Sequence, residues 1–184
     1  MSNIGVIILK PDAVQEGISD QMIADFQALG GELLLKKEFQ FLPAHIPRIL
    51  LPIDFLEARP LMVHGYIQSY LSGPSVITVV RFEGVDNATE HIVKLKGKID
   101  TNGIRNKYFP YDENDLYNVE HLEYPNGVGD LQLGFVKCRN RIHSPETEEE
   151  TLEMLELTLS KSEMKYIENL GFKVEFKNEA LKLV

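Results

Sequence analysis

Three consecutive stretches near the N-terminus decide the fold: NIGVIILK (3–10), ISDQMIADFQALG (18–30) and GELLLKKEFQFL (31–42). The first is a near-continuous apolar run that ends before Pro11, which predicts a buried strand. The second carries apolar residues at helical spacing, and Gly30 with the following Gly31 predicts where the helix ends. The third predicts a second strand, which Pro43 stops. Together they predict a β-α-β unit.

A second unit of the same kind is predicted further along the chain. Residues 44–71 have a helical pattern that three prolines interrupt, so short helices are expected there. Asn87 is placed to cap a helix over 87–97. The remaining expectations are a strand over 75–80, a loop over 98–106, a polar surface loop over 107–130 and a fourth strand, LQLGFVKC, over 131–138.

The C-terminal part is predicted to be mainly helical. Ser144 is a candidate N-cap, with Pro145 at the first helical position and Glu146 in the first turn, so a helix is expected from there to residue 159. Leu152, Leu155 and Leu159 share one face of it. A last helix follows over 160–171, and residues 172–184 have the alternating character of an edge strand.

This order of elements predicts the fold class, an α/β (α+β) sandwich. It is the order of a ferredoxin-like split βαβ, with a four-stranded antiparallel sheet and helices packed on it. The length of 184 residues predicts a single domain, 1–184. A fold of this kind does not determine a chemistry, so function has to be argued from particular residues.

Composition excludes several classes of function. The chain is 43% hydrophobic and 26% charged, as in ordinary globular proteins, and no apolar run is long enough to cross a membrane. The N-terminus lacks the basic region and cleavage site of a signal peptide, and a single cysteine, Cys138, fits a reducing compartment, so a cytoplasmic protein is expected. A net charge of −9 argues against nonspecific binding of nucleic acid.

An anionic substrate would need a local cluster of basic side chains to overcome this negative charge. The candidates are Lys10, Arg59, Arg105, Lys107, Arg139 and Arg141. His143 follows the last two, in RNRIHS (139–144), and precedes the predicted helix. A helix N-terminus favours anions and disfavours imidazolium, so this histidine could be a neutral nucleophile; the alternative is a histidine that only packs at a junction. The other histidines show no metal-ligand spacing.

Taken as a set, the motifs resemble those of nucleoside diphosphate kinases. The matching stretches, in order, are IILKPDAVQEG (7–17), Arg59-Pro60, SGPSV (72–76), Gly103-Ile104-Arg105 and RNRIHS (139–144), and the resemblance runs from residue 3 to about 158. The KPD-x-VQ-x-G and RN-x-IH segments are quite specific in combination. Either of them alone would only be suggestive.

The resemblance implies a ping-pong phosphoryl transfer in which His143 takes the γ-phosphate of a nucleoside triphosphate and passes it to a nucleoside diphosphate. It implies that Lys10, Arg59 and Arg105 hold phosphates, with Mg²⁺ bridging phosphate oxygens and no metal held by the protein itself. Asn140 would contact the nucleotide, Ser144 would place a hydroxyl beside the histidine, and Glu153 would orient its other ring nitrogen. A homo-oligomer is also implied.

The sequence departs from the family pattern at several of these positions. Ser144 directly follows the histidine, where the family has one residue between, so its role and that of Glu153 require a one-residue deletion; without it, Met154 takes the glutamate position. Leu61 replaces the phenylalanine that stacks on the base. The family's phosphate-binding tyrosine falls near Ile53 or Phe55. Its helix arginine falls at Val93, with Lys94 and Lys96 close by, and its threonine falls at Ile99.

Two further departures concern length. Residues 107–131 are an insertion before the last motif, and residues 160–184 are a C-terminal extension. The insertion could cover the site, replace lost contacts or form an interface, or it could be a loop without a role.

Two other functions stay open at this point. One is a nucleotide-binding protein of the same fold that does not turn over, which the lost phosphate and base contacts would explain. The other is a structural or regulatory ferredoxin-like module, whose acidic surface and insertion would face a partner.

Overall fold

The structure is a computed structural model that describes residues 2–46, 60–97, 102–109 and 139–172, with only the backbone of residues 60–62. Its centre is a four-stranded sheet in the order β2-β3-β1-β4. The strands are β1 (Ile4–Leu9), β2 (Gly31–Phe39), β3 (Ser75–Phe82) and β4 (Ile142–His143). All three neighbouring pairs are antiparallel. The predicted ferredoxin-like arrangement is therefore confirmed.

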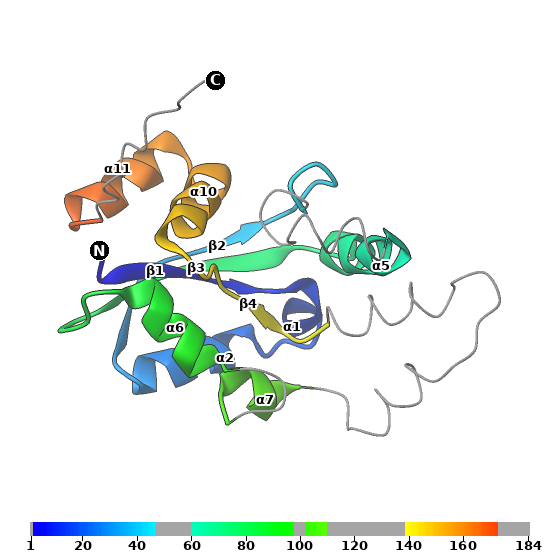
Figure 1. Ribbon diagram of the computed structural model, residues 1–184, viewed down its shortest axis with the longest axis horizontal. Helices are drawn as coiled ribbons and strands as arrows, with labels where there is room; N and C mark the ends of the chain where they lie inside the picture. The colour runs from blue at the N-terminus through cyan, green and yellow to red at the C-terminus, as the bar shows by residue number, and fades with distance from the viewer. Residues whose placement is uncertain (1, 47–59, 98–101, 110–138, 173–184) are drawn as a thin grey trace, which may run out of the picture.

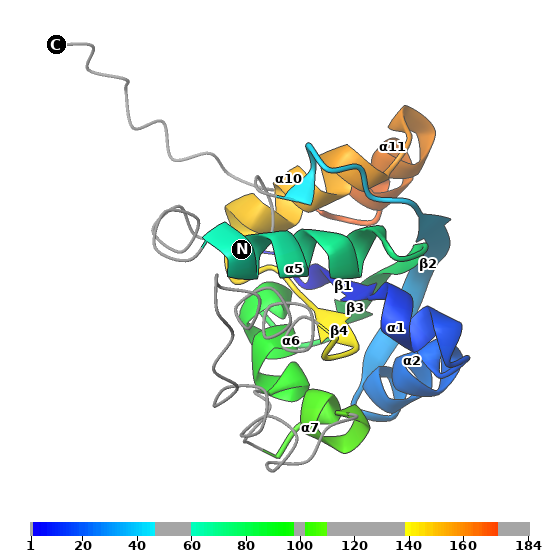
Figure 2. The same ribbon diagram turned by 90° about the vertical axis from the view of Figure 1, so that its right-hand side faces the viewer.

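Helices cover both faces of the sheet (Figures 1 and 2). On one face lie α10 (Glu148–Thr158) and α11 (Lys161–Asn169); on the other lie α2 (Ser19–Ala28) and α6 (Ala88–Lys96). The remaining helices in the described part are α1 (Pro11–Gln15), α5 (Pro60–Leu71) and α7 (Ile104–Tyr108).

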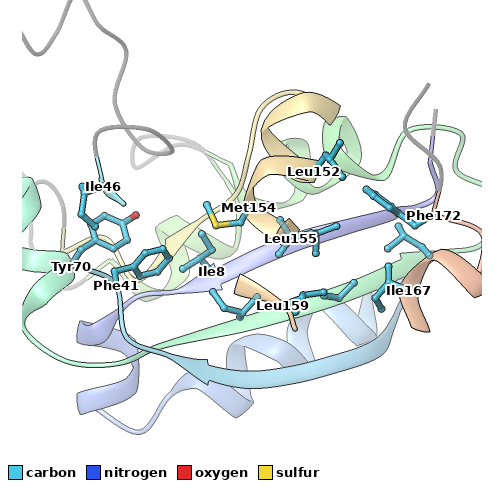
Figure 3. Packing of buried hydrophobic residues seen from close by; sticks show 14 residues of the cluster. Ile8, Phe41, Ile46, Tyr70, Leu152, Met154, Leu155, Leu159, Ile167 and Phe172 are labelled. Atoms are coloured by element: carbon cyan, nitrogen blue, oxygen red, sulfur yellow. The ribbon is translucent and has the colours of Figure 1, made fainter. Parts of the chain in front are cut away.

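The first strand is buried on both of its faces, which explains its uninterrupted apolar sequence. Ile4, Val6 and Ile8 pack under α10 and α11, in the cluster that Figure 3 shows. Ile7 and Leu9 point the other way and pack against α2 and α6. All five are at most 1% exposed, and each such side chain contributes roughly 1.5–3 kcal/mol relative to an exposed one.

Helix capping follows the sequence closely at two of the predicted starts. Asn87 accepts a hydrogen bond from the backbone N–H of Glu90, as expected for the cap of α6. Ser160 and Glu163 form a capping box at the start of α11. Each such cap is worth about 1 kcal/mol.

The predicted start of α10 is wrong. The helix begins at Glu148, and its N-cap is Thr147, whose hydroxyl accepts from the N–H of Glu150 at 3.1 Å. The reason is that Ile142 and His143 pair with β1 as a strand, so the chain is still extended when it leaves the sheet. Ser144 consequently lies between the two elements, and it caps neither.

Two short helices were not expected from the sequence. Residues 98–106 were predicted to be loop, but α7 begins at Ile104, and α1 begins at Pro11 directly after β1. Each has five residues, which is too short to show a hydrophobic period. The strand predicted over 131–138 and the edge strand predicted over 172–184 lie outside the described residues, except for Phe172.

Candidate functional site

His143 lies on β4, opposite Ile8 of the central strand β1. The residue is half-buried, and its Nε2 is closed off from solvent without a hydrogen-bond partner in the described part of the chain. Nδ1 is therefore the ring nitrogen that remains open to a substrate. A histidine held by sheet pairing has a fixed backbone, so its reactive atom has a defined position.

A strained turn directly precedes this strand. Arg141 has a φ of 67°, and the N–H of Ile142 donates to the carbonyl of Asn140 at 2.8 Å across it. A non-glycine residue in this conformation persists only where its surroundings hold it. The turn thus needs a specific support, and the KPD segment provides it.

Asp12 is the main support of the turn. Its carboxylate accepts the N–H of Arg141 at 3.0 Å, and its carbonyl accepts from Nη1 of the same arginine, also at 3.0 Å. The side chains of Asp12 and Arg141 are 1% and 4% exposed, and Glu16 completes the arrangement with an ion pair of 2.5 Å to Nη1. Arg141 is therefore structural in its contacts, although the sequence made it a phosphate-binding candidate.

Lys10 joins the same turn from the end of β1. Its N–H donates to the carbonyl of Arg141 at 2.9 Å, and its Nζ donates to Oδ1 of Asn140 at 2.7 Å. The ammonium also lies 5.1 Å from the ring centre of Tyr70, on α5. The residue is 3% exposed. Two of the residues predicted to bind the nucleotide, Lys10 and Asn140, are thus in direct contact.

Two further cations reach the histidine from α6 and α7. Arg105 donates from Nη2 to the carbonyl of Ile142 at 3.0 Å. Lys96, the last residue of α6, is 4% exposed, and its Nζ lies 3.5 Å from the carbonyl of Ser144. The backbone on either side of His143 is therefore contacted by a cation, and three cations from three elements converge on this residue.

These charges and burial determine the protonation state of His143. Burial, and then the charges of Lys96, Lys10 and Arg105, hold the pKa of the imidazole well below its usual range. The ring is therefore neutral near pH 7, as a nucleophile must be. The sequence attributed this neutrality to a helix N-terminus, which is wrong, because α10 begins five residues further on.

The structure brings together only part of the predicted catalytic set. Ser144 is buried next to the histidine, and its hydroxyl has no hydrogen-bond partner among the described residues. Glu153 lies on the exposed face of α10, and the structure gives no hydrogen bond between it and His143. The contact predicted for Glu153 is therefore absent, and Met154 beside it is buried in the core. The reason is the helix period, which turns residues 151, 152, 154 and 155 towards the sheet.

The other predicted nucleotide contacts are not all described. Arg59 lies outside the described residues, as does the side chain of Leu61, although its backbone belongs to α5. Lys107 pairs with Asp25 at 2.7 Å, so its charge is used on α2. In the described ranges no three His, Cys, Asp or Glu side chains are placed to hold a metal ion.

Sequence reasoning assigned no role to Lys96 or Asp12. Asp12 belongs to the KPD motif, so the motif points to it, but the sequence does not show which atoms its carboxylate contacts. In the sequence, Lys96 stands only as a lysine near Val93, the position of the family's helix arginine. Helical spacing could have placed it on the buried face of α6, since it lies four residues after the fully buried Ile92.

Gly103 is predicted to be essential for the position of Arg105. A Cβ there would meet the carbonyl oxygen of Lys96 at 2.7 Å and Cα of Gly97 at 2.8 Å, both backbone atoms that cannot swing away. Gly103→Ala should therefore cost about 1–3 kcal/mol in urea unfolding. Gly73→Ala is the matched control, because its Cβ would meet the end of the Gln15 side chain at 3.1 Å and Cβ of Pro11 at an ordinary contact distance of 3.7 Å, and no backbone atom; equal losses in both variants would contradict this packing.

The fold is that of nucleoside diphosphate kinases. No family model matches the sequence, and no curated protein matches it. Solved structures do: an NDP kinase from Pyrobaculum aerophilum has a TM-score of 0.59 at 19% identity, covering 89% of this chain and 98% of that one. The Aquifex aeolicus nucleoside diphosphate kinase gives 0.57 at 22%, covering 88% and 97%.

A third similar structure is the nucleoside-diphosphate kinase from Borrelia burgdorferi, a transition-state mimic with bound vanadate and ADP. Its TM-score is 0.60 at 17% identity, and the match covers 87% of this chain and 88% of that one. Likeness at such identities shows the fold alone.

Among the helices of the described residues, none has both the length and the apolar character needed to span a bilayer.

Proposed function

We propose that this protein is a phosphotransferase, a nucleoside diphosphate kinase that works through a phosphohistidine at His143. One observation carries the proposal: a neutral histidine lies among Lys10, Lys96 and Arg105 in a chain whose net charge is −9. Converging cations are what a polyphosphate substrate needs, and an unprotonated imidazole is what phosphoryl transfer to nitrogen needs.

The proposed reaction has two half-reactions at the same nitrogen. The Nδ1 lone pair attacks the γ-phosphorus of a nucleoside triphosphate; the N–P bond forms as the bond to the bridging oxygen breaks, and the electron pair leaves on the β-phosphate of the diphosphate product. A second nucleoside diphosphate then attacks the phosphohistidine with its terminal oxygen and restores the free ring. Because little covalent chemistry falls to the protein, catalysis rests on positioning and on charge.

The remaining roles follow from the placement of each group. Lys10 and Arg105 would bind phosphate oxygens, and Asn140, held by Lys10, would contact the nucleotide. Arg59 and Leu61 are proposed for the phosphates and the base from the sequence resemblance. The side chains around the histidine are cationic, so they fit a phosphate group and not a Mg²⁺ ion. Mg²⁺ would arrive bound to the nucleotide's phosphates, where it would offset their negative charge. The single domain, the homo-oligomer and the cytoplasmic location stay predictions from the sequence.

A nucleotide-binding protein without useful turnover is the second candidate. The observation that favours it is the unpartnered Nε2 of His143, since a proton on that atom has no acceptor in the described part of the chain. Attack through Nδ1 would develop positive charge on the ring, and no described side chain accepts a proton from Nε2 to relieve it. This observation supports slow transfer over fast transfer by the same proposed nucleophile.

Labelling with γ-³²P-ATP and Mg²⁺ distinguishes the two candidates. A kinase should take up acid-labile label to near one equivalent and lose it when GDP is added. A nucleotide binder should take up none, while ATP still raises its melting temperature in proportion to ln(1 + [L]/Kd). If the protein takes up no label and ATP causes no thermal shift, both functions are contradicted.

A further inference from the structure

We propose that Lys96 is a catalytic cation that pairs with the oxygens of the phosphoryl group while His143 carries it. This inference rests on the proposed function and deepens it, because it assigns to α6 a phosphate ligand that none of the sequence motifs contains. Lys96 would also supply the positive charge that the family's helix arginine provides and that this chain lacks at Val93.

The position of the ammonium supports this role. Lys96 ends α6 and is 4% exposed, yet its Nζ lies 3.5 Å from the Ser144 carbonyl, its one acceptor among the described residues, which is at the limit for a hydrogen bond. No carboxylate lies within ion-pair distance of it in the described residues. A buried ammonium carries three donors, and isolated burial of such a charge is costly. The site thus holds a cation with unused donors beside the nucleophile.

The groups that face Lys96 explain why a phosphoryl group fits there. His143, Arg105 and Lys10 face it from β4, from α7 and from the residue after β1, while Glu146 and Glu150 act from further along the chain. Burial, then Arg105 and Lys10, lower the pKa of Lys96 to about 8, and the two glutamates only partly oppose them. A phosphoryl group on His143 adds close to two negative charges at the point where these cations meet.

The proposal has a consequence for pH. Phosphohistidine should raise the pKa of Lys96 again, so above about pH 8 the Lys96 amine must take up a proton when His143 is phosphorylated. The phosphorylated ring can also lose its Nε2 proton, but this loss is common to wild type and to every Lys96 variant. At a fixed ratio of MgATP to MgADP, the phosphorylated fraction of wild type should therefore fall, relative to a variant whose residue 96 does not titrate, as the pH rises from 8 to 9.5. Nucleotide phosphates are fully ionised in this range, so this relative fall reports on Lys96.

The experiment measures the equilibrium constant of phosphorylation in wild type, Lys96→Met, Lys96→Arg and Lys94→Met. Relative to Lys96→Arg, wild type should lose up to tenfold per pH unit above pH 8. Lys96→Met should start about 10- to 100-fold lower than wild type and keep a constant ratio to Lys96→Arg across this range. Lys96→Arg should restore most of the loss and add no pH dependence of its own, because guanidinium keeps its proton.

Lys94→Met is the matched control. It removes the same charge from the same helix, but its side chain is 70% exposed and pairs with Glu90, so it should behave as wild type. Folding of Lys96→Met is checked by its melting temperature. Since burial lowers the pKa of Lys96 in the folded state, its charge destabilises the fold below about pH 8, and this variant should melt no lower than wild type at pH 7.

Two results would overturn the inference: a Lys96→Met variant that equals wild type at pH 7.5, or one that keeps the wild-type fall above pH 8. Absence of phosphoenzyme in wild type would instead count against the proposed function. In that event binding of inorganic pyrophosphate decides: at least tenfold weaker binding in Lys96→Met supports the ammonium as a phosphate ligand, and equal binding refutes it.

Discussion

His143→Asn is expected to abolish the phosphoenzyme and to lower phosphate exchange between ATP and GDP by at least about 10⁴-fold. Asparagine offers a similar shape to the pocket but no nitrogen with a free lone pair. Under the proposed mechanism, the reaction would then need direct transfer between two nucleotides, without the phosphohistidine. The measurement is the steady-state exchange rate, beside incorporation of ³²P from γ-labelled ATP.

The fold of this variant should be intact, since removal of the ring takes away no hydrogen bond in the described part of the chain and no charge, because the ring is neutral near pH 7. His91→Asn is the matched control: this ring packs on Phe82 with ring centres 4.8 Å apart and is not among the residues proposed for the chemistry, so exchange should persist. Exchange in His143→Asn within tenfold of wild type would contradict a phosphohistidine route.

Asp12→Ala is expected to give the largest loss of stability, about 3 kcal/mol in the free energy of unfolding. The substitution leaves the buried Arg141 guanidinium without its buried carboxylate, and it also leaves the N–H of that residue without an acceptor. Arg141 is held at a φ of 67°, so the turn should relax and carry Asn140 and His143 away from Lys10. Phosphorylation should slow by about 10²-fold, because a small displacement of the reacting groups can lower a rate by that factor.

The control for Asp12 is its neighbour in the same cluster. Glu16→Ala removes the other carboxylate that contacts Arg141, but that side chain is 47% exposed, so the expected cost is below about 1 kcal/mol. Urea unfolding measures both variants. If the two lose the same amount, the buried pair does not hold the turn, and the account of why the KPD segment matters is wrong.

The sheet and the helices around it were predictable because their signals are local. The apolar runs of β1 and β3 have few alternatives, and the caps of α6 and α11 are single residues with a known geometry. The leucines predicted to share a face, Leu152, Leu155 and Leu159, do lie in one core cluster. Each of these predictions needs no knowledge of what lies across the fold.

The failures arise where sheet pairing overrides a local signal. Ser144 and Pro145 form a good helix start in sequence, but pairing of His143 with Ile8 keeps the chain extended there. The same shift places Glu153 on the solvent face of α10, away from the ring it was expected to orient. A motif alignment with an assumed deletion cannot detect this, because one residue turns a helix by about 100°.

The site itself was predictable only as a list of residue types. The motifs named His143, Lys10, Arg105 and Asn140, and the structure brings all four to one turn. They could not name Lys96, because its role depends on α6 ending beside α7, and Gly103 sets that contact. Cations that converge from distant parts of a chain are a property of the fold.

The central claim is that Nδ1 of His143 carries the phosphoryl group, and locating that group tests it most directly. The protein is phosphorylated with MgATP, the modified residue is found by mass spectrometry of peptides kept at alkaline pH, and ³¹P NMR distinguishes the two ring nitrogens. We expect a single phosphorylated residue, His143, modified on Nδ1, because Nε2 is closed off from solvent. Phosphate on Nε2, on another residue, or on none would contradict it.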